Sequence, residues 1–296
     1  MFGFLNVNKP SGITSHQVIS KLRKITGIKQ IGHAGTLDPL ACGVLPVAIG
    51  KATKLLDYLP SDKAYIVKMQ FGKRSDTYDI EGNVEETNYR KIMLVEIEKG
   101  LVFQQGKVKQ IPPAFSAVHY NGKRLYELAR EGKIPDDIPA REITIYENKI
   151  LNFDFEKQIL ELKVVCSKGT YIRTIVNDLG EYTNAGAVMI ELTRINSANM
   201  NLDDAISLTD ETTKADIMSA LIEPKQVLDL AIVELNDEHY KKVLNGNKFQ
   251  LKAKVGDILL SYEEKIVALA NSDGKFIQPK KVLLWRKFLF WFVLYF

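Results

Sequence analysis

Strand-like and helix-like patterns follow one another irregularly along this chain, and this irregularity is what most constrains its fold. The segment KAYIVKMQFG, residues 63–72, alternates between apolar and polar positions and predicts a half-buried strand. Residues 142–155 and 158–167 predict two further strands joined by a tight turn. Because no strand–helix–strand unit repeats, the sequence predicts an α+β fold with a mixed, largely antiparallel sheet flanked by helices and loops.

The segment TSHQVISKLRKITG predicts a helix with clear start and stop signals. Thr14 and Gln17 fit a capping box, and Gly27 is placed to end the helix. Its polar side carries Lys21 and Lys24 among other basic residues. This helix is therefore expected to be amphipathic, with a basic outer face.

Basic residues dominate the start of the chain. Residues 1–37 contain five Lys or Arg and no Asp or Glu, although the formal net charge of the whole chain is only +4. Such a segment suits a polyanionic partner, because each cation that neutralises a phosphate releases a counterion. An ordinary solvated helix face explains the same pattern equally well.

Length and cysteine content limit the class of protein. With 296 residues the chain can form one large domain and a small one. Two cysteines, Cys42 and Cys166, cannot build a disulfide framework, so a reducing cytoplasm is expected. No signal peptide and no bilayer-spanning run is recognisable, so no membrane association is expected.

The stretch GHAGTLDPLACGVL is too rich in glycine and proline to be one regular helix or strand. Pro39 stiffens the turn after Asp38, and Gly35 permits unusual dihedral angles and close approach of another chain. Asp-Pro pairs commonly begin turns, so Asp38 alone is more readily explained as structural. A thiolate nucleophile formed by Cys42 with His33 is a weaker alternative, because a small residue beside a glycine bend usually packs.

A second motif, SKGTYIRTIVNDLG, predicts a strand-to-helix junction. Thr170 is the expected N-cap of the helix, and Gly180 is its expected end. Tyr171 and Arg173 then lie at the junction, where side chains often face a cleft. A buried tyrosine and a solvated arginine are the plainer interpretation of the motif taken alone.

Other chemistries find little support in the sequence. The glycine-rich phosphate-binding and dinucleotide-binding motifs are both missing. The four histidines are scattered, with no cysteine pair beside any of them, which disfavours a zinc site. No nucleophile elbow of a serine hydrolase is recognisable.

Several blocks, taken in order, closely resemble the bacterial TruB family of pseudouridine synthases. They run from about residue 5 to 197 and are NKPSGITSHQV, GHAGTLDPLACGVLPVAIGKATK, the AY of KAYIVKMQFG, IPPAFSAV with GKRLYELAREG, and CSKGTYIRTIVNDLG. The GTLDP and KGTYIRT blocks are the most specific. The resemblance implies the pseudouridine-synthase fold and isomerisation of uridine 55 in the tRNA T loop.

The resemblance also assigns catalytic roles. The reaction breaks the uridine N-glycosidic bond, rotates the base and rejoins it through carbon 5, which requires one carboxylate and neither metal nor cofactor. Asp38 is implied as that carboxylate, either as a nucleophile or as a base that removes a sugar proton. Arg173 is implied to pair with Asp38 and aim it. Tyr65 is implied to stack on the target base where the carbon 5 proton is removed.

The remaining site positions concern RNA binding and support. Tyr171 is implied to line the pocket, Leu192 to pack the base, and His33 to occupy the place that the extruded base vacates. Lys21 and Lys24 are expected to contact phosphates. The supporting-loop positions, expected to be structural, are Lys9, Pro10, Gly35 and Pro39.

The same resemblance divides the chain into functional parts. Residues 1–230 are implied to form the catalytic domain, with a thumb-like insertion at about 111–141. Residues 231–284 are similar to a small β-rich PUA-type RNA-binding module. The aromatic run at 285–296 matches nothing in the family, and we interpret it as an appended segment of unknown role.

Three functions can be weighed from these observations. The leading one is a standalone enzyme that acts on the tRNA T stem-loop, as a monomer and without an obligate protein partner. A noncatalytic RNA-binding or RNA-folding protein is the alternative, disfavoured because binding alone does not require the carboxylate. An RNA-guided relative inside a multiprotein particle is disfavoured by the thumb-like insertion.

Overall fold

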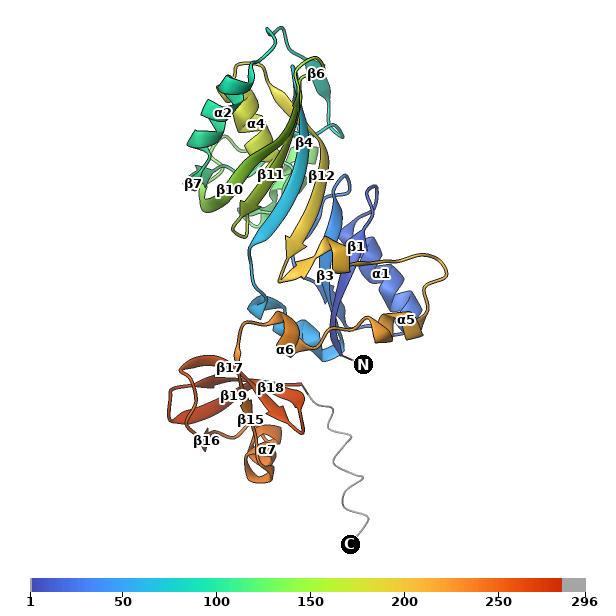
Figure 1. Cartoon of the computed structure of the whole chain (residues 1–296), viewed down its shortest axis with the longest axis vertical. Helices are drawn as coiled ribbons and strands as arrows, with labels where there is room; N and C mark the ends of the chain where they lie inside the picture. Colours follow the sequence, from blue (N-terminus) through green and yellow to red (C-terminus); the bar gives the residue numbers. More distant parts are fainter. Residues whose placement is uncertain (1, 284–296) are drawn as a thin grey trace.

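The computed structural model describes residues 2–283, so the aromatic tail predicted at 285–296 lies outside the described residues. Two sheets dominate the described chain, a ten-stranded one and a five-stranded one (Figure 1). No helix within residues 2–283 is long and apolar enough to cross a membrane.

The large sheet is mixed and mainly antiparallel, which confirms the predicted α+β fold. Its order is β14-β1-β3-β12-β4-β11-β10-β7, with β2 paired to β3 and β13 to β12. The β1–β14 and β3–β12 pairs are parallel. Its strands are β1 Gly3–Lys9, β2 Ile31–His33, β3 Cys42–Ile49, β4 Lys63–Phe71, β7 Gly106–Gln110, β10 Arg141–Asp154, β11 Ile159–Cys166, β12 Ala187–Ser197, β13 Met200–Asn201 and β14 Ile206–Ser207.

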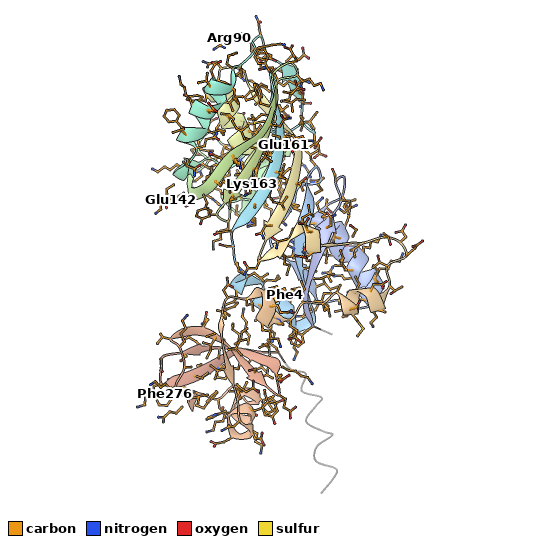
Figure 2. All side chains as sticks on the ribbon, viewed as in Figure 1. Phe4, Arg90, Glu142, Glu161, Lys163 and Phe276 are labelled. Carbon is orange, nitrogen blue, oxygen red and sulfur yellow. The ribbon has the colours of Figure 1, made fainter. Side chains whose placement is uncertain are left out.

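Helices cover one face of this sheet. Near β4, β10 and β11 they are α2 and α4, and beside β1 they are α1 and α5 (Figure 1). Glu161 and Lys163, which alternate with buried positions of β11, lie on the face turned away from α2 and α4 (Figure 2). The helices are α1 Ser15–Thr26, α2 Leu94–Phe103, α3 Leu125–Arg130, α4 Ile172–Tyr182, α5 Lys214–Ser219, α6 Pro224–Val227 and α7 Asp237–Leu244, with 3-10 helices η1 Gly50–Tyr58 and η2 Leu202–Asp204.

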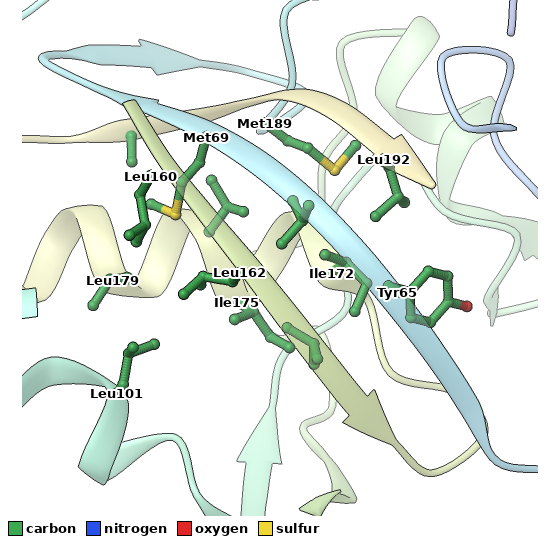
Figure 3. Packing of buried hydrophobic residues seen from close by; sticks show 14 of the residues in the cluster. Tyr65, Met69, Leu101, Leu160, Leu162, Ile172, Ile175, Leu179, Met189 and Leu192 are labelled. Carbon is green, nitrogen blue, oxygen red and sulfur yellow. The ribbon is translucent and has the colours of Figure 1, made fainter. Parts of the chain in front are cut away.

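Strand β4 follows the predicted alternation. The side chains that face α4 are at most 7% exposed and belong to one apolar cluster, which includes Ile175 and Leu179 of α4 (Figure 3). They are Tyr65, Val67, Met69 and Phe71. Tyr65 lies at the end of this row, so its ring is buried while its hydroxyl lies at the margin of the apolar core.

The predicted limits of α1 are confirmed. Thr14 and Gln17 form the capping box, and Gly27 ends the helix in the left-handed conformation at φ 73°. At α4 both predicted limits are wrong. Tyr171, not Thr170, is the N-cap, because the Thr170 hydroxyl donates instead to the Ser167 carbonyl at 3.0 Å.

The helix α4 also continues through Gly180 to Tyr182. A Cβ at position 180 would lie 2.3 Å from the backbone nitrogen of Ala187, the first residue of β12. Gly180 is therefore a site of close helix–strand approach and not a helix terminator. A tertiary contact explains this glycine, and local sequence reasoning could not distinguish it from an end signal.

The five-stranded sheet begins at Ala231 and has the order β15-β17-β18-β19-β16. Leu259 and Leu269 of this sheet share an apolar cluster with Phe4 of β1 and Leu55 of η1, so the two sheets are joined through an apolar contact. The functional division at 230/231 stays a prediction. The strands are β15 Ala231–Glu234, β16 Phe249–Gln250, β17 Gly256–Tyr262, β18 Lys265–Ser272 and β19 Phe276–Val282.

Residues 111–141 connect the neighbouring strands β7 and β10. They contain the two-stranded sheet of β8 His119–Tyr120 and β9 Lys123–Arg124, followed by α3. A second two-stranded sheet, β5 Lys73–Ser75 with β6 Val84–Glu86, follows β4. Residues from both excursions reach the site described next.

Candidate active site

Asp38 lies on the loop between β2 and β3, and the N-terminal segment holds this loop from behind. The Leu37 N–H donates to the Ser15 hydroxyl oxygen at 2.9 Å, and that hydroxyl lies 3.1 Å from the Leu37 carbonyl oxygen. The Gly12 N–H donates to the carbonyl of Pro39 at 2.8 Å. Hydrogen bonds to the backbone groups of Leu37 and Pro39 thus hold the two residues that flank Asp38, and this restricts the direction of the Asp38 side chain.

Lys9 and Pro10 belong to this support. The Lys9 ammonium is fully buried and donates to the carbonyls of Pro10 and Ile13 at 2.9 and 2.6 Å. Burial lowers the pKa of Lys9. Its donors are occupied by backbone carbonyls, so Lys9 stabilises the turn behind Asp38 and does not face a substrate.

Arg173, in the first turn of α4, meets Asp38. Its Nη2 lies 3.0 Å from Oδ2 of Asp38, and its side chain is 7% exposed against 42% for Asp38. The same guanidinium donates to the carbonyl of Thr77 at 2.9 Å and to that of Phe115 at 3.1 Å. A buried, multiply bonded cation therefore holds a carboxylate that remains accessible to a ligand.

Asp79 is a functional candidate that the sequence analysis missed. Its Oδ2 lies 3.6 Å from Nη1 of Arg173, and its side chain is 6% exposed. The Thr77 hydroxyl and the Glu81 N–H donate to its Oδ1 at 2.6 and 3.0 Å. An aspartate in a polar loop such as KRSDTYDIEGN is usually solvated, so no local signal distinguishes it.

Two carboxylates, those of Asp38 and Asp79, thus flank one guanidinium, and Glu81 lies nearby. Burial raises the pKa of Glu81, and the nearby charges of Asp79 and Asp38 raise it further. Arg173 therefore lies at the centre of a locally acidic cluster. Its positive charge stabilises a half-exposed ion pair with Asp38 and a buried one with Asp79.

Tyr65 and Leu192 come from adjacent strands and lie in the same apolar cluster as Leu37. Figure 3 shows the Tyr65 ring at the end of β4, with Leu192 on the neighbouring strand β12. Burial raises the pKa of Tyr65, and the charge of Arg194 opposes that rise. The two side chains supply an aromatic and an aliphatic wall on one face of the sheet.

Tyr171 is held at the strand-to-helix junction by a side chain that sequence reasoning did not find. Gln110, at the end of β7, accepts from the Tyr171 N–H at 2.8 Å and donates to the Tyr171 carbonyl at 3.0 Å. The first of these bonds satisfies an N–H that a helix N-terminus leaves free, while the Tyr171 carbonyl also accepts from the Ile175 N–H of the helix at 3.3 Å. Tyr171 itself is half-buried.

His33 is the last residue of β2, where it pairs in register with Val47. Its Nδ1 is buried and has no hydrogen-bond partner among the described residues. Burial lowers the pKa of His33, and the charges of Arg194 and His16 lower it further. His33 is therefore a neutral ring at neutral pH, suited to stacking more than to proton transfer.

Lys21 and Lys24 lie apart from this group, on the outer side of α1. The Lys21 ammonium is 2.8 Å from the exposed carboxylate of Asp210, while Lys24 is exposed. With a rise of about 1.5 Å per residue, Lys21 is about 9 Å along the helix from Ser15, which contacts the Asp38 loop. A phosphate at Lys21 would have to replace Asp210, a weak surface partner.

The alternative nucleophile, Cys42, contacts Thr193, with 3.3 Å between Sγ and Oγ1. Both cysteines are free thiols. Among residues 2–283, no group of three His, Cys, Asp or Glu side chains is arranged to hold a metal ion. The accessible Asp38 carboxylate is therefore the reactive group that this geometry presents best.

Solved structures define the class of this fold. The chain superimposes with a TM-score of 0.71 and 23% identity on a chain of "Crystal Structure of a Cbf5-Nop10-Gar1 Complex", covering 97% of this chain and 86% of that one. A second match, to "Structure of H/ACA RNP bound to a substrate RNA containing 2'-deoxyuridine", has a TM-score of 0.69 and 22% identity, covering 96% and 86%. The fold is that of the pseudouridine synthases.

Sequence comparison narrows the class to one family. The family model described as TruB family pseudouridylate synthase (N terminal domain) matches residues 23–172. The protein named tRNA pseudouridine synthase B of Synechocystis sp. is 42% identical, covering 96% of this chain and 100% of the relative. The one of Lactobacillus johnsonii is 40% identical, covering 95% and 98%. The chain belongs to the TruB family.

Proposed function

We propose that this protein isomerises a uridine of tRNA to pseudouridine, and that the target is position 55 in the T loop. The observation that carries the chemistry is the accessible Asp38 carboxylate held 3.0 Å from the buried Arg173 guanidinium. The substrate class is supported by relatives named tRNA pseudouridine synthase B that match nearly the whole chain at about 40% identity.

The reaction breaks the bond between ribose carbon 1′ and base N1, rotates the base and joins carbon 5 to carbon 1′. The proton leaves carbon 5, the C5–C6 double bond re-forms, and N1 gains a proton. Asp38 acts next to the ribose and base, either by adding to one of them as a nucleophile or by removing a sugar proton. Both routes need a carboxylate fixed in direction, which its flanking backbone bonds and Arg173 provide.

The substrate base must leave the folded T loop to reach Asp38, at a cost of a few kcal/mol of unstacking. The buried ring of Tyr65 and the side chain of Leu192 offer stacking and packing surfaces for the extruded base, and Tyr171, at the strand-to-helix junction, is assigned to the pocket wall. We assign to Tyr65 the removal of the carbon 5 proton. His33, held uncharged by burial, replaces the base in the RNA stack.

Lys9, Pro10, Gly35 and Pro39 act through structure, because they shape and brace the loop around Asp38. Lys21 and Lys24, together with residues 111–141, supply phosphate contacts. The isomerisation uses no cofactor. Residues 231–284 are proposed to be a PUA-type module that adds RNA contacts.

We further propose that the protein works as a monomer, in the cytoplasm and without an obligate protein partner. The insertion at 111–141 supports this assignment. It is proposed to bind the RNA directly, and its Phe115 carbonyl accepts a hydrogen bond from Arg173, so the chain itself links RNA binding to the catalytic site. The accessible carboxylate disfavours a purely RNA-binding protein, because binding alone does not require the cluster of acids around Arg173.

The test is a single-turnover incubation of the full chain with unmodified tRNA, followed by mapping of pseudouridine. Wild type should modify U55, and Asp38→Asn should abolish modification while leaving tRNA binding largely intact, since phosphate contacts supply most affinity. The exposed Asp203→Asn is the matched control and should behave as wild type. Rapid turnover by Asp38→Asn, with mass spectrometry showing no deamidation, would contradict the assignment.

A further inference from the structure

Arg194, on β12, is the largest fully buried side chain of the described protein, with 0% exposure. Its Nε donates to the carbonyl of Val44 at 2.7 Å, and its Nη2 donates to the carbonyl of Gly35 at 3.1 Å. Its Nη1 is buried and, within residues 2–283, has no assigned hydrogen-bond partner and no carboxylate in an ion pair with it. Burying a cation with an unsatisfied hydrogen-bond donor costs free energy of folding, so this arrangement needs an explanation.

The sheet register places Arg194 beside Tyr65. The two residues are direct partners across the antiparallel β12–β4 pair, so their side chains leave the sheet on the same face, with Cβ atoms about 5 Å apart. On its other side Arg194 pairs with Gly43 of β3, where a Cβ would lie 2.3 Å from the Arg194 carbonyl oxygen. The absence of a side chain at Gly43 lets β3 approach β12 closely enough for the bond to Val44.

Arg194 also reaches the loop that carries Asp38. Gly35, three residues before Asp38, presents its carbonyl to Nη2, and a Cβ on Gly35 would lie 3.5 Å from Nη1. One guanidinium therefore contacts the catalytic loop and lies next to the strand that presents Tyr65. A substitution of Arg194 would therefore affect both the Asp38 loop and the position of Tyr65.

The positive charge of Arg194 affects the pKa values of the ionisable groups around it. Burial raises the pKa of Tyr65, the positive charge of Arg194 opposes that rise, and the charge of Asp38 adds to it. Burial lowers the pKa of Lys63, and Arg194 lowers it further. The positive charge of Arg194 is thus not cancelled by a neighbouring acid, and the Tyr65 phenol is the group on which it can act favourably.

We propose that Arg194 is a positioning residue for Tyr65, with its Nη1 donating to the phenol oxygen while Nε and Nη2 fasten β12 to β3 and to the Asp38 loop. The inference rests on the proposed function in one respect, that Tyr65 takes up the carbon 5 proton. In that step the phenol oxygen takes the proton from carbon 5 as its own O–H proton passes to water, and the C–H electron pair re-forms the C5–C6 double bond. A cationic donor at the phenol oxygen stabilises the negative charge that develops there as the O–H proton leaves.

The pairing itself is tested without RNA. In the full-length protein, Tyr65→Phe should shift the NMR signal of the Arg194 guanidinium, because the acceptor of Nη1 is removed. Arg194→Gln should move the titration of ¹³C-labelled Tyr65 to higher pH, and Arg194→Lys should restore part of the difference. An Arg194 signal and a Tyr65 titration that both stay unchanged would overturn the proposal. The Tyr65→Phe measurement keeps Arg194, so it remains decisive if the Arg194 variants do not fold.

The catalytic consequence is tested in single turnover with tRNA that carries uridine or 5-deuterouridine at the target. Arg194→Lys should slow the reaction by about 10- to 100-fold, the range of one charge-assisted hydrogen bond, and should enlarge the isotope effect. A purely structural role would slow the reaction and leave the isotope effect unchanged, which would contradict the proposal. Arg74→Lys, at an exposed pair with Glu181, is the control. If wild type modifies no tRNA, the proposed function fails while the Tyr65 titration still decides the pairing.

Discussion

Two buried arginines, Arg173 and Arg194, both contact the loop that carries Asp38 and show how differently one residue type can be used. Arg173 is buried and meets the carboxylates of Asp38 and Asp79, so its charge is compensated. Arg194 is 0% exposed, and two of its nitrogens donate to backbone carbonyls. Its third nitrogen, Nη1, has no hydrogen-bond partner among the described residues. The first arrangement fixes a reactive carboxylate, while the second leaves positive charge for a tyrosine. Burial alone therefore does not reveal the role, but the charge balance does.

The largest effect is expected where the compensated arginine is removed. Arg173→Ala leaves two acids facing each other without a cation, so activity should fall by orders of magnitude and stability by about 3–5 kcal/mol. Arg173→Lys should recover only part of either, because an ammonium cannot reproduce a planar fork. Single-turnover rates and denaturant unfolding measure the two quantities. Arg74→Ala, which breaks an exposed pair, should cost no more than about 1 kcal/mol.

Asp79→Asn sharpens the comparison by making Arg173 more like Arg194. The amide can still accept from Thr77 and from the Glu81 N–H, but one of the two compensating charges is removed. We expect a decrease of about 1–3 kcal/mol in stability and a clear fall in rate, smaller than for Arg173→Ala. Asp76→Asn, exposed in the same loop and bonded to Asn83, is the matched control. Equal rates for the two variants would show that Asp79 has no part in fixing the site.

His33→Ala tests whether His33, whose pKa is lowered by burial and by the charge of Arg194, acts as an uncharged stacking group. Because the pKa of His33 is lowered below its ordinary 6.5 by burial and by Arg194, the ring is neutral in the folded state at pH 7 and above. The unfolded state binds more protons below that range, so His33 penalises folding only as the pH falls through about 6.5. The His33→Ala variant should extrude the base more slowly than wild type, by the same factor at every pH from 7 to 8. A deficit that changes across this window would indicate proton transfer.

The smallest effect is expected far from both arginines, on the outer face of α1. Lys21→Ala with Lys24→Ala should weaken tRNA binding modestly and reduce the slope of log affinity against log salt by up to about 0.9 for each phosphate that is no longer neutralised. Lys21 already pairs with Asp210, which reduces its expected share. Binding titrations at several salt concentrations measure the slope. An unchanged slope would assign both lysines to the solvated surface.

Local structure was largely readable from the sequence. The capping box and final glycine of α1, the alternation of β4 and the strand pair β10–β11 depend on neighbours in the chain, so their signals are short-range. The motifs taken alone favoured a structural Asp38 and a solvated Arg173; the family resemblance implied that they pair, and the structure places them 3.0 Å apart. The resemblance to a family supplied the chemistry that periodicity could not.

Tertiary structure decided the rest, because those contacts join residues that no local pattern connects. Asp79 is an ordinary loop acid until the fold brings it to Arg173, and Gly180 resembles a helix stop until β12 passes within van der Waals distance of it. Arg194 contacts Gly35 across 159 residues, and only strand register sets it opposite Tyr65. The sequence determined which groups are available and which segments are rigid. The fold determined which charges are compensated, and that balance separates the two buried arginines.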